Sequence, residues 1–285
     1  MGRRLVTAGV AAALGAGALV GASSTAADAA DTTKTGTSTY TCTFPIIGAQ
    51  QVPVDMTIPN ISAGFPEIPA GLPLSQGSLN ASYVFHAGPD VAGLLPAVSN
   101  LGASDMTILL GSKAVKVAEF AFGTPTPVEG GGVDLPATGT NSDFSVPGGG
   151  VYDLTMPKSF VLSGTSALGD VSVPCTTSAD PAVLDTLTVV KNDSTTTVTA
   201  PAKVKKGKVA KIVTKVAGGV SDFRGKVVIK DGKKKLGTAA LNDAGKAVFK
   251  AKGLKVGKHK ITAKWAGDAY RNASKSKAVV VKVVK

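Results

Sequence analysis

The chain has 285 residues, of which 44% are hydrophobic and 18% are charged, and its formal net charge is +12. This composition is typical of a globular protein, and the length corresponds to one or two domains. After the first 30 residues no segment approaches the roughly 20 consecutive apolar residues that a membrane-spanning helix needs, so we predict no membrane span in the mature chain.

The charge is distributed very unevenly along the chain. Residues 31–190 contain 4 Lys and Arg against 13 Asp and Glu, a net charge of −9. Residues 191–285 contain 25 Lys and Arg against 5 Asp and Glu, a net charge of +20. A step of this size indicates a domain boundary, which we place near Asp193.

The first 29 residues have the pattern of a secretory signal peptide. Arg3 and Arg4 precede an apolar run, and Ala27 and Ala29 supply the small side chains that signal peptidase requires. The alternative, a membrane anchor, fits less well because the run is short and rich in Gly and Ala. We therefore predict a cleaved signal at 1–29 and a secreted protein. Export could follow the general or the twin-arginine route.

Residues 30–39 are polar, and we predict a flexible leader there. The two cysteines of the chain, Cys42 and Cys175, lie near the two ends of the next segment, 40–177. In an exported protein an even number of cysteines favours a disulfide over metal binding or nucleophilic catalysis. We predict that a Cys42–Cys175 bridge closes this segment into a domain.

Alternating polar and apolar residues predict about eight short strands in this domain, which is typical of an antiparallel β-sandwich or barrel. Pro53 lacks an N–H, so we expect its strand at an edge. Residues 59–77 are rich in Pro and Gly and predict a loop, and 89–102 is the only predicted helix. The predicted strands are 40–44, 51–58, 79–86, 105–110, 113–120, 151–156, 159–163 and 170–175.

The sequence Leu-Pro-Ala-Thr-Gly at 135–139 matches the pentapeptide that sortases use for anchoring. A working signal of this kind is followed directly by an apolar span and a basic tail. Here polar residues follow, and a large part of the chain is still to come. We therefore interpret the stretch as a loop and not as an anchor.

Residues 178–193 are interpreted as a linker that includes one strand at 186–190. The last segment, 194–285, shows seven alternating stretches in about 90 residues, which predicts a seven-stranded immunoglobulin-like (Ig-like) sandwich. Asp231-Gly232 and the residues 242–245 are suited to hairpin turns between these strands. The whole chain is thus predicted to be all-β.

The sequence Gly-Lys-His-Lys-Ile-Thr-Ala-Lys-Trp-Ala-Gly-Asp-Ala-Tyr at 257–270, followed by a Val-rich strand, resembles a bacterial Ig-like domain. Such domains are repeated in surface and secreted proteins of actinobacteria. The resemblance implies an extracellular spacer or adhesion module of the cell envelope rather than an enzyme. The preceding domain is similar to an uncharacterised domain of actinobacterial secreted proteins, on the residues 40–48 and 173–175.

No catalytic or cofactor-binding signature is present in the sequence. The only histidines, His86 and His259, lie in different domains, and neither a Gly-x-Ser-x-Gly nor a His-Glu-x-x-His motif occurs. Carboxylates are scattered over the first domain without a pattern that pairs them, although two carboxylates would suffice for a glycosidase. We predict no enzyme activity, no cofactor and no metal.

The candidate binding residues are lysines of the last domain that alternate with apolar residues. In an Ig-like sandwich their strands belong to one sheet, so the lysines would form one cationic face that binds a polyanion. The alternative is a solvated surface that keeps the strands soluble. The six candidates are Lys226, Lys230, Lys258, Lys260, Lys264 and Lys282.

We therefore expect a secreted, non-catalytic protein of the cell envelope whose basic domain binds anionic wall polymers. Sequence-specific recognition of nucleic acid is disfavoured because the basic residues of 191–285 are 23 Lys and only 2 Arg. Two alternatives stay open: a secreted hydrolase of polysaccharide or cell wall with a targeting module, and a purely structural spacer.

Overall fold

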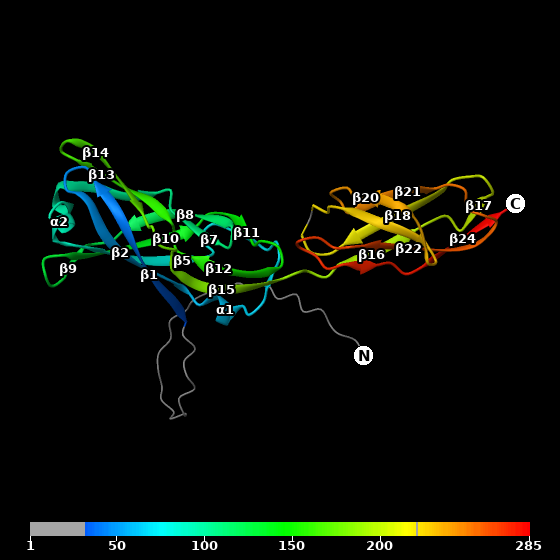
Figure 1. Cartoon of the computed structure of the whole chain (residues 1–285), viewed down its shortest axis with the longest axis horizontal. Coiled ribbons are helices and arrows are strands. Elements are labelled where there is room, and N and C mark those ends of the chain that lie inside the picture. The colour runs from blue at the N-terminus through cyan, green and yellow to red at the C-terminus, as the bar shows by residue number, and fades with distance from the viewer. Residues whose placement is uncertain (1–31, 221) are drawn as a thin grey trace, which may run out of the picture. The chain divides into compact units, whose positions relative to one another are not determined.

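The computed structural model describes residues 32–220 and 222–285, and strands dominate both domains (Figure 1). The predicted signal peptide at 1–29 lies outside the described residues. In the described part the helices are three short segments: α1 (Ile61–Gly64), α2 (Pro89–Ala92) and the 3₁₀ helix η1 (Leu95–Ala97). The predicted all-β fold class is confirmed.

The N-terminal domain is built on one large, curled sheet of 13 strands. Along the main path the strands are β3 (Ile68–Pro69), β15 (Val183–Val190), β12 (Gly150–Thr155), β7 (Thr107–Leu110), β8 (Lys113–Phe122), β10 (Val133–Asn141), β5 (Asn80–Ala87), β2 (Gly48–Pro59), β1 (Thr33–Phe44), β14 (Gly169–Thr176), β13 (Ser159–Ser166) and β6 (Val98–Ser104). β9 (Thr126–Pro127) pairs with β10, and β4 (Pro73–Leu74) forms a separate pair with β11 (Phe144–Ser145).

The long hairpin β1–β2 corrects the predicted flexible leader. Every residue of β1 from Thr33 onward has a partner in β2, ending with Phe44 opposite Gly48. The leader residues are polar, but Thr and Ser at alternating positions suit a strand with one exposed face. β2 is also an internal strand rather than an edge. Four residues of β2, from Val54 to Thr57, pair with β5. Pro53 lies just before them, so its missing N–H is tolerated.

The predicted disulfide is confirmed. Cys42 and Cys175 lie directly opposite each other on the adjacent strands β1 and β14, and both are fully buried. The bridge closes a loop with a sequence separation of 133 residues. It therefore joins the first and last parts of the domain within its core.

The predicted linker at 178–193 is wrong for residues 183–190, which form β15, although the strand predicted at 186–190 is present. β15 pairs with β12 and β3 in the large sheet, and Leu184, Leu187 and Val189 are buried in its core. The N-terminal domain thus extends to Val190, beyond the predicted limit at residue 177. The difference has a physical cause. β15 follows a turn that contains Ser and Pro, and the sequence does not reveal that this strand pairs with β12 and β3.

Two further predictions for this domain need correction. The predicted helix at 89–102 is reduced to α2 and η1, since residues from Val98 onward form β6. The stretch 135–139 is not a loop but part of the central strand β10, where Leu135 and Ala137 are buried between β5 and β8. The strands predicted at 105–110 and 113–120 correspond to β7 and β8, which form a hairpin with positive φ at Gly111 in its turn.

The Ig-like domain is a sandwich of two sheets, and the seven predicted strands are all present (Figure 1). One sheet has the order β16 (Thr195–Thr199), β18 (Ala210–Ala217) and β21 (Lys246–Ala251). The other has the order β17 (Lys203–Lys205), β24 (Val279–Val284), β22 (Gly257–Trp265), β19 (Lys226–Asp231) and β20 (Lys234–Ala240), and β23 (Ser274–Lys275) pairs with β22. The short strands β17 and β23 were not predicted.

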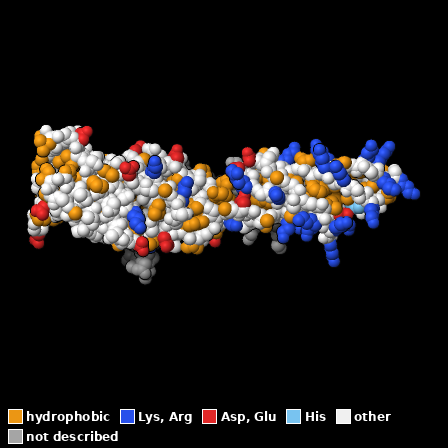
Figure 2. All heavy atoms as spheres, turned by 45° about the horizontal axis from the view of Figure 1, so that its top comes forward, with side chains coloured by type: hydrophobic (Ala, Val, Ile, Leu, Met, Phe, Trp, Pro, Cys, Tyr) orange, Lys and Arg blue, Asp and Glu red, His pale blue; other side chains and the backbone are white. Residues whose placement is uncertain are grey.

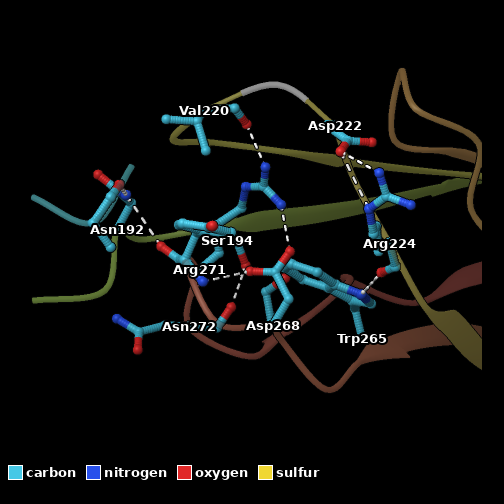
Figure 3. A network of polar contacts seen from close by, with 12 residues as sticks. Asn192, Ser194, Val220, Asp222, Arg224, Trp265, Asp268, Arg271 and Asn272 are labelled. Carbon is cyan, nitrogen blue, oxygen red and sulfur yellow. Dashed lines mark hydrogen bonds and ion pairs between the residues drawn. The ribbon is translucent and has the colours of Figure 1, made fainter. Parts of the chain in front are cut away.

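A buried arginine fixes the loops at one end of this sandwich (Figure 3). Arg271, which is 0% exposed, forms an ion pair with Asp268, donates to the carbonyl oxygen of Val220 and lies 4.0 Å from the centre of the Phe223 ring. The indole N–H of Trp265 donates to the carbonyl oxygen of Arg224 at 3.2 Å. These contacts attach the turn after Trp265 to the loop that precedes β19.

Candidate functional site

The structure brings all six predicted lysines onto the outer surface of one sheet. β24, β22 and β19 are neighbours in that order, and the lysines alternate with buried residues such as Val227, Ile261 and Val281. Lys258 lies directly opposite Lys282 across β22 and β24. We call the set Lys226, Lys230, Lys258, Lys260, Lys264 and Lys282 the lysine face; all are exposed except Lys230, which is half-buried.

Two lysines extend the lysine face that the sequence alone did not identify. Lys203 on β17 is the register partner of Lys282, so that Lys203, Lys282 and Lys258 form one cross-strand row. Lys275 on β23 is the partner of Lys264. The sequence did not indicate these two lysines because β17 and β23 are too short for alternation to be recognised. The only sign is Lys-Val-Lys at 203–205, in which two lysines flank an apolar residue.

Carboxylates that could neutralise these lysines are nearly absent from the strands of the Ig-like domain. The strands as described contain 15 lysines and one acidic residue, Asp231. The Asp231 carboxylate is already engaged, with His259 Nδ1 at 2.6 Å and the backbone N–H of Lys260 at 3.0 Å. Within residues 222–285 and 191–220 no lysine forms a salt bridge. Their charge is therefore available to an external anion.

The opposite sheet of the Ig-like domain is also basic. On β18 and β21, Lys211 lies opposite Lys250, and Lys215 lies opposite Lys246. All four are exposed. Figure 2 shows Lys and Arg side chains gathered over the strands of the Ig-like domain and few on the visible side of the N-terminal domain.

His259 lies at the edge of the core, on the same side of β22 as the buried residues Ile261, Ala263 and Trp265. Its side chain is 13% exposed, and its Nε2 lies 2.7 Å from the carbonyl oxygen of Lys255. The hydrogen bond with Asp231 raises the pKa of His259 above its ordinary value. The histidine thus joins two ends of strands and is not part of the lysine face.

The N-terminal domain contains a polar cluster that the sequence did not indicate. His86 lies between two carboxylates, with Nδ1 2.7 Å from Asp134 and Nε2 3.1 Å from Asp55. Thr37 donates to Asp55 at 2.6 Å. The three strands that carry the histidine and the carboxylates are adjacent, but only their register reveals that these residues meet.

The charges of this cluster depend on each other. Partial burial opposes the positive charge of His86, but hydrogen bonds to Asp134 and Asp55 outweigh it and raise the pKa of His86 above 6.5. The hydrogen bond from Thr37, together with His86, lowers the pKa of Asp55 below 3.8. The cluster is an ion-pair network on a sheet surface.

The next features are the carboxylates that line cavities of the N-terminal domain and the groups of side chains that could hold a metal ion. Two apolar cavities of the N-terminal domain each have a single carboxylate in their lining, Asp170 in one and Glu67 in the other. Among residues 32–220 and 222–285, no group of three or more His, Cys, Asp and Glu has a geometry suited to a metal ion. In the same part of the chain no helix is long and apolar enough to cross a membrane.

Three solved structures that resemble this chain do so at low sequence identity. A "Putative membrane anchored protein" from Corynebacterium diphtheriae is 18% identical, with a TM-score of 0.39, over 88% of this chain and 59% of that one. Fibronectin(III)-like modules of Clostridium thermocellum CbhA are 14% identical, with a TM-score of 0.27, over 76% and 87%. The ectodomain of mouse nectin-like molecule 4 is 14% identical, with a TM-score of 0.24, over 76% and 62%.

This chain therefore spans about 59% of the length of the C. diphtheriae protein. No curated protein gives a significant match. The family comparison is more specific, because it covers the domain for which the sequence predicted an Ig-like sandwich and the structure has two facing sheets. Residues 196–284 match the model of the bacterial Ig-like domain (group 3), which agrees with the Ig-like sandwich that these residues form.

Proposed function

We propose that this is an exported, non-catalytic protein of the bacterial cell envelope, whose Ig-like domain binds anionic cell-wall polymers and so holds the N-terminal domain at the wall. The family match of residues 196–284 supports a role as an envelope module. The Cys42–Cys175 disulfide supports an oxidising, extracytoplasmic location. The sequence resemblance to actinobacterial secreted proteins supports the same location.

The observation that carries the proposal is the set of cross-strand lysine rows without carboxylate partners. Like charges directly opposite each other in a sheet destabilise it, so such rows lower the stability of the free domain. Lys203, Lys282 and Lys258 form one such row. A polyanion bound along the row would relieve this repulsion and, by linkage, would stabilise the fold.

Lysine also defines the type of recognition. Its ammonium group is a flexible point charge, whereas arginine offers the planar fork that reads nucleobases and fixed phosphates. The lysine face therefore favours a polymer of repeating phosphate or carboxylate groups, bound without sequence specificity. Wall teichoic acid has this chemistry.

The experiment is a sedimentation assay of the full chain with purified Gram-positive cell walls, before and after chemical removal of their teichoic acid. Binding should be strong at low ionic strength, should fall steeply as salt is raised through about 0.15 M, and should disappear with the teichoic acid. Undiminished binding to stripped walls would contradict the proposal. Absence of binding at every salt concentration would favour the spacer, and breakdown of the wall would favour the hydrolase.

A further inference from the structure

The interior of the N-terminal domain contains two apolar cavities that share no lining residue. Their volumes are about 490 Å³ and 360 Å³. Phe85 lines the larger cavity and Tyr83 the smaller one, and the centres of these two rings are 6.4 Å apart. Both volumes lie in the range of small-molecule sites, whereas well-packed protein interiors have few voids larger than a water molecule.

The smaller cavity is almost entirely hydrophobic. Strands of the curled sheet contribute Ile58, Ile108, Leu154 and Leu187 to its wall. Its lining contains one charged residue, Glu67, which is exposed, and no Lys or Arg. The buried amide of Asn141 is fully used, since it accepts from Leu79 and donates to the carbonyl oxygens of Ser75 and Ser142. These polar groups are therefore no obstacle to an apolar occupant.

One polar group in this wall has no partner. Tyr83 is 1% exposed, and its hydroxyl forms no hydrogen bond with any described residue. The other buried tyrosine of the same core, Tyr40, donates to the carbonyl oxygen of Pro157 at 2.6 Å. Burial raises the pKa of Tyr83 above its ordinary value, so the phenol stays neutral and keeps its proton to donate. Buried hydroxyls are almost always paired, so this exception calls for a partner.

The cavity has an apolar opening to solvent. Phe65 and Leu72 belong to its lining, yet their side chains are 64% and 38% exposed. Phe65 directly follows α1, which is fixed because Asp185 accepts from both the backbone N–H and the hydroxyl of Ser62. An exposed aromatic ring beside an apolar cavity would provide a first contact for a hydrophobic molecule.

We propose that the smaller cavity binds an uncharged, apolar small molecule that carries a carbonyl oxygen, and that Tyr83 donates a hydrogen bond to this oxygen. A charged ligand is disfavoured because the lining contains no cation to pair with an anion, and burial of an unpaired charge is costly. The larger cavity does not share this specificity, since its lining has no unpaired buried polar group. The proposal does not depend on the lysine face, which belongs to the other domain.

The test compares two neutral fluorescent probes of similar size on the full chain. One, 6-propionyl-2-dimethylaminonaphthalene, has a carbonyl acceptor, and the other, N-phenyl-1-naphthylamine, has none. Tyr83→Phe should weaken binding of the carbonyl probe roughly three- to tenfold and shift its emission to the blue, because a hydrogen bond is lost. Binding of the second probe should be unchanged. Equal effects on both probes, or no binding of the carbonyl probe, would overturn the proposal.

A pair of surface variants locates the probe. Phe65→Asp places a charge at the opening of the smaller cavity, and Leu168→Asp does the same at the larger one, where Leu168 is 92% exposed. Only Phe65→Asp should weaken binding of the carbonyl probe. If Leu168→Asp weakens binding of the carbonyl probe, or if neither variant does, the probe binds elsewhere and the proposal is overturned. Both positions are exposed, so the fold should tolerate the changes, which circular dichroism would verify.

Discussion

At the scale of single residues, Tyr83 and Tyr40 provide a matched pair, because both are buried in the same core and only Tyr40 has a hydrogen-bond partner. Tyr83→Phe removes an unsatisfied hydroxyl and should raise the free energy of unfolding by about 1 kcal/mol in the absence of ligand. Tyr40→Phe should lower it by about 1 kcal/mol or more, because the carbonyl of Pro157 loses its donor. Urea denaturation measures both, and a loss of stability with Tyr83→Phe would show that the hydroxyl is already paired.

The cluster of His86, Asp55 and Asp134 predicts how stability changes with pH. The raised pKa of His86 means that its contribution is fully present below the unfolded value of 6.5 and is lost as pH rises through the folded pKa. The lowered pKa of Asp55 means that its contribution is present above 3.8 and is lost as pH falls through the folded pKa. The cluster therefore contributes most between these two values.

Replacement by a neutral residue isolates this effect from that of His259. In His86→Asn the decrease in the free energy of unfolding between pH 5 and pH 8 should be smaller than in the wild type. Thr37, Asp55 and Asp134 are left in place, and the second histidine contributes equally to both proteins. An unchanged decrease, measured by urea denaturation at the two pH values, would mean that the pKa of His86 does not differ between the folded and unfolded protein.

At the scale of elements, the loops of the Ig-like domain depend on Arg271. Arg271→Gln leaves Asp268, whose side chain is 17% exposed, without its cation and removes the contact with Phe223. Loss of one partner of a buried ion pair typically costs about 3–5 kcal/mol. Arg224→Gln is the control, since its pair with Asp222 lies on the surface, and no measurable change is expected. Equal stability of the two variants in urea denaturation would refute this role of Arg271.

Most elements of the Ig-like domain were predictable from sequence because its strands have one buried and one exposed face. The seven predicted strands therefore match the structure, whereas β17 and β23 are too short for alternation to be seen. In the N-terminal domain the same pattern fails to predict two strands of the large sheet correctly. The sequence predicts the strand at 186–190 only as part of a linker, whereas β15 belongs to the large sheet, and the central strand β10 contains Pro and Gly, which usually indicate a loop.

The candidate sites were predictable to different degrees for a related reason. Alternation plus the assumption of an Ig-like sheet order predicts that the six lysines share one sheet surface, whereas their binding of a polyanion stays a proposal. The meeting of His86 with Asp55 and Asp134 requires the register of three strands, which a single sequence does not contain. The cavity beside Tyr83 depends on how side chains pack across a curled sheet, and no local pattern encodes that.

At the scale of the whole molecule, the chain combines an acidic domain that has a disulfide and internal cavities with a strongly basic Ig-like domain. The net charges of −9 for residues 31–190 and +20 for residues 191–285 separate the two kinds of chemistry. In this account the basic domain provides attraction to a polyanion, and the N-terminal domain provides any selectivity for a small ligand. Because the two sites use different residues, variants of one should leave the other unaffected.

The central claim is that the lysine face, and not the net charge alone, binds the wall polymer. The most direct measurement compares two variants of the full chain that lose the same charge. One replaces Lys258, Lys260, Lys264 and Lys282 by Gln, and the other replaces Lys211, Lys215, Lys246 and Lys250 on the opposite sheet. At 0.1 M salt the first should bind teichoic-acid-bearing walls at least about tenfold more weakly than the second. Equal weakening of the two variants would contradict the claim.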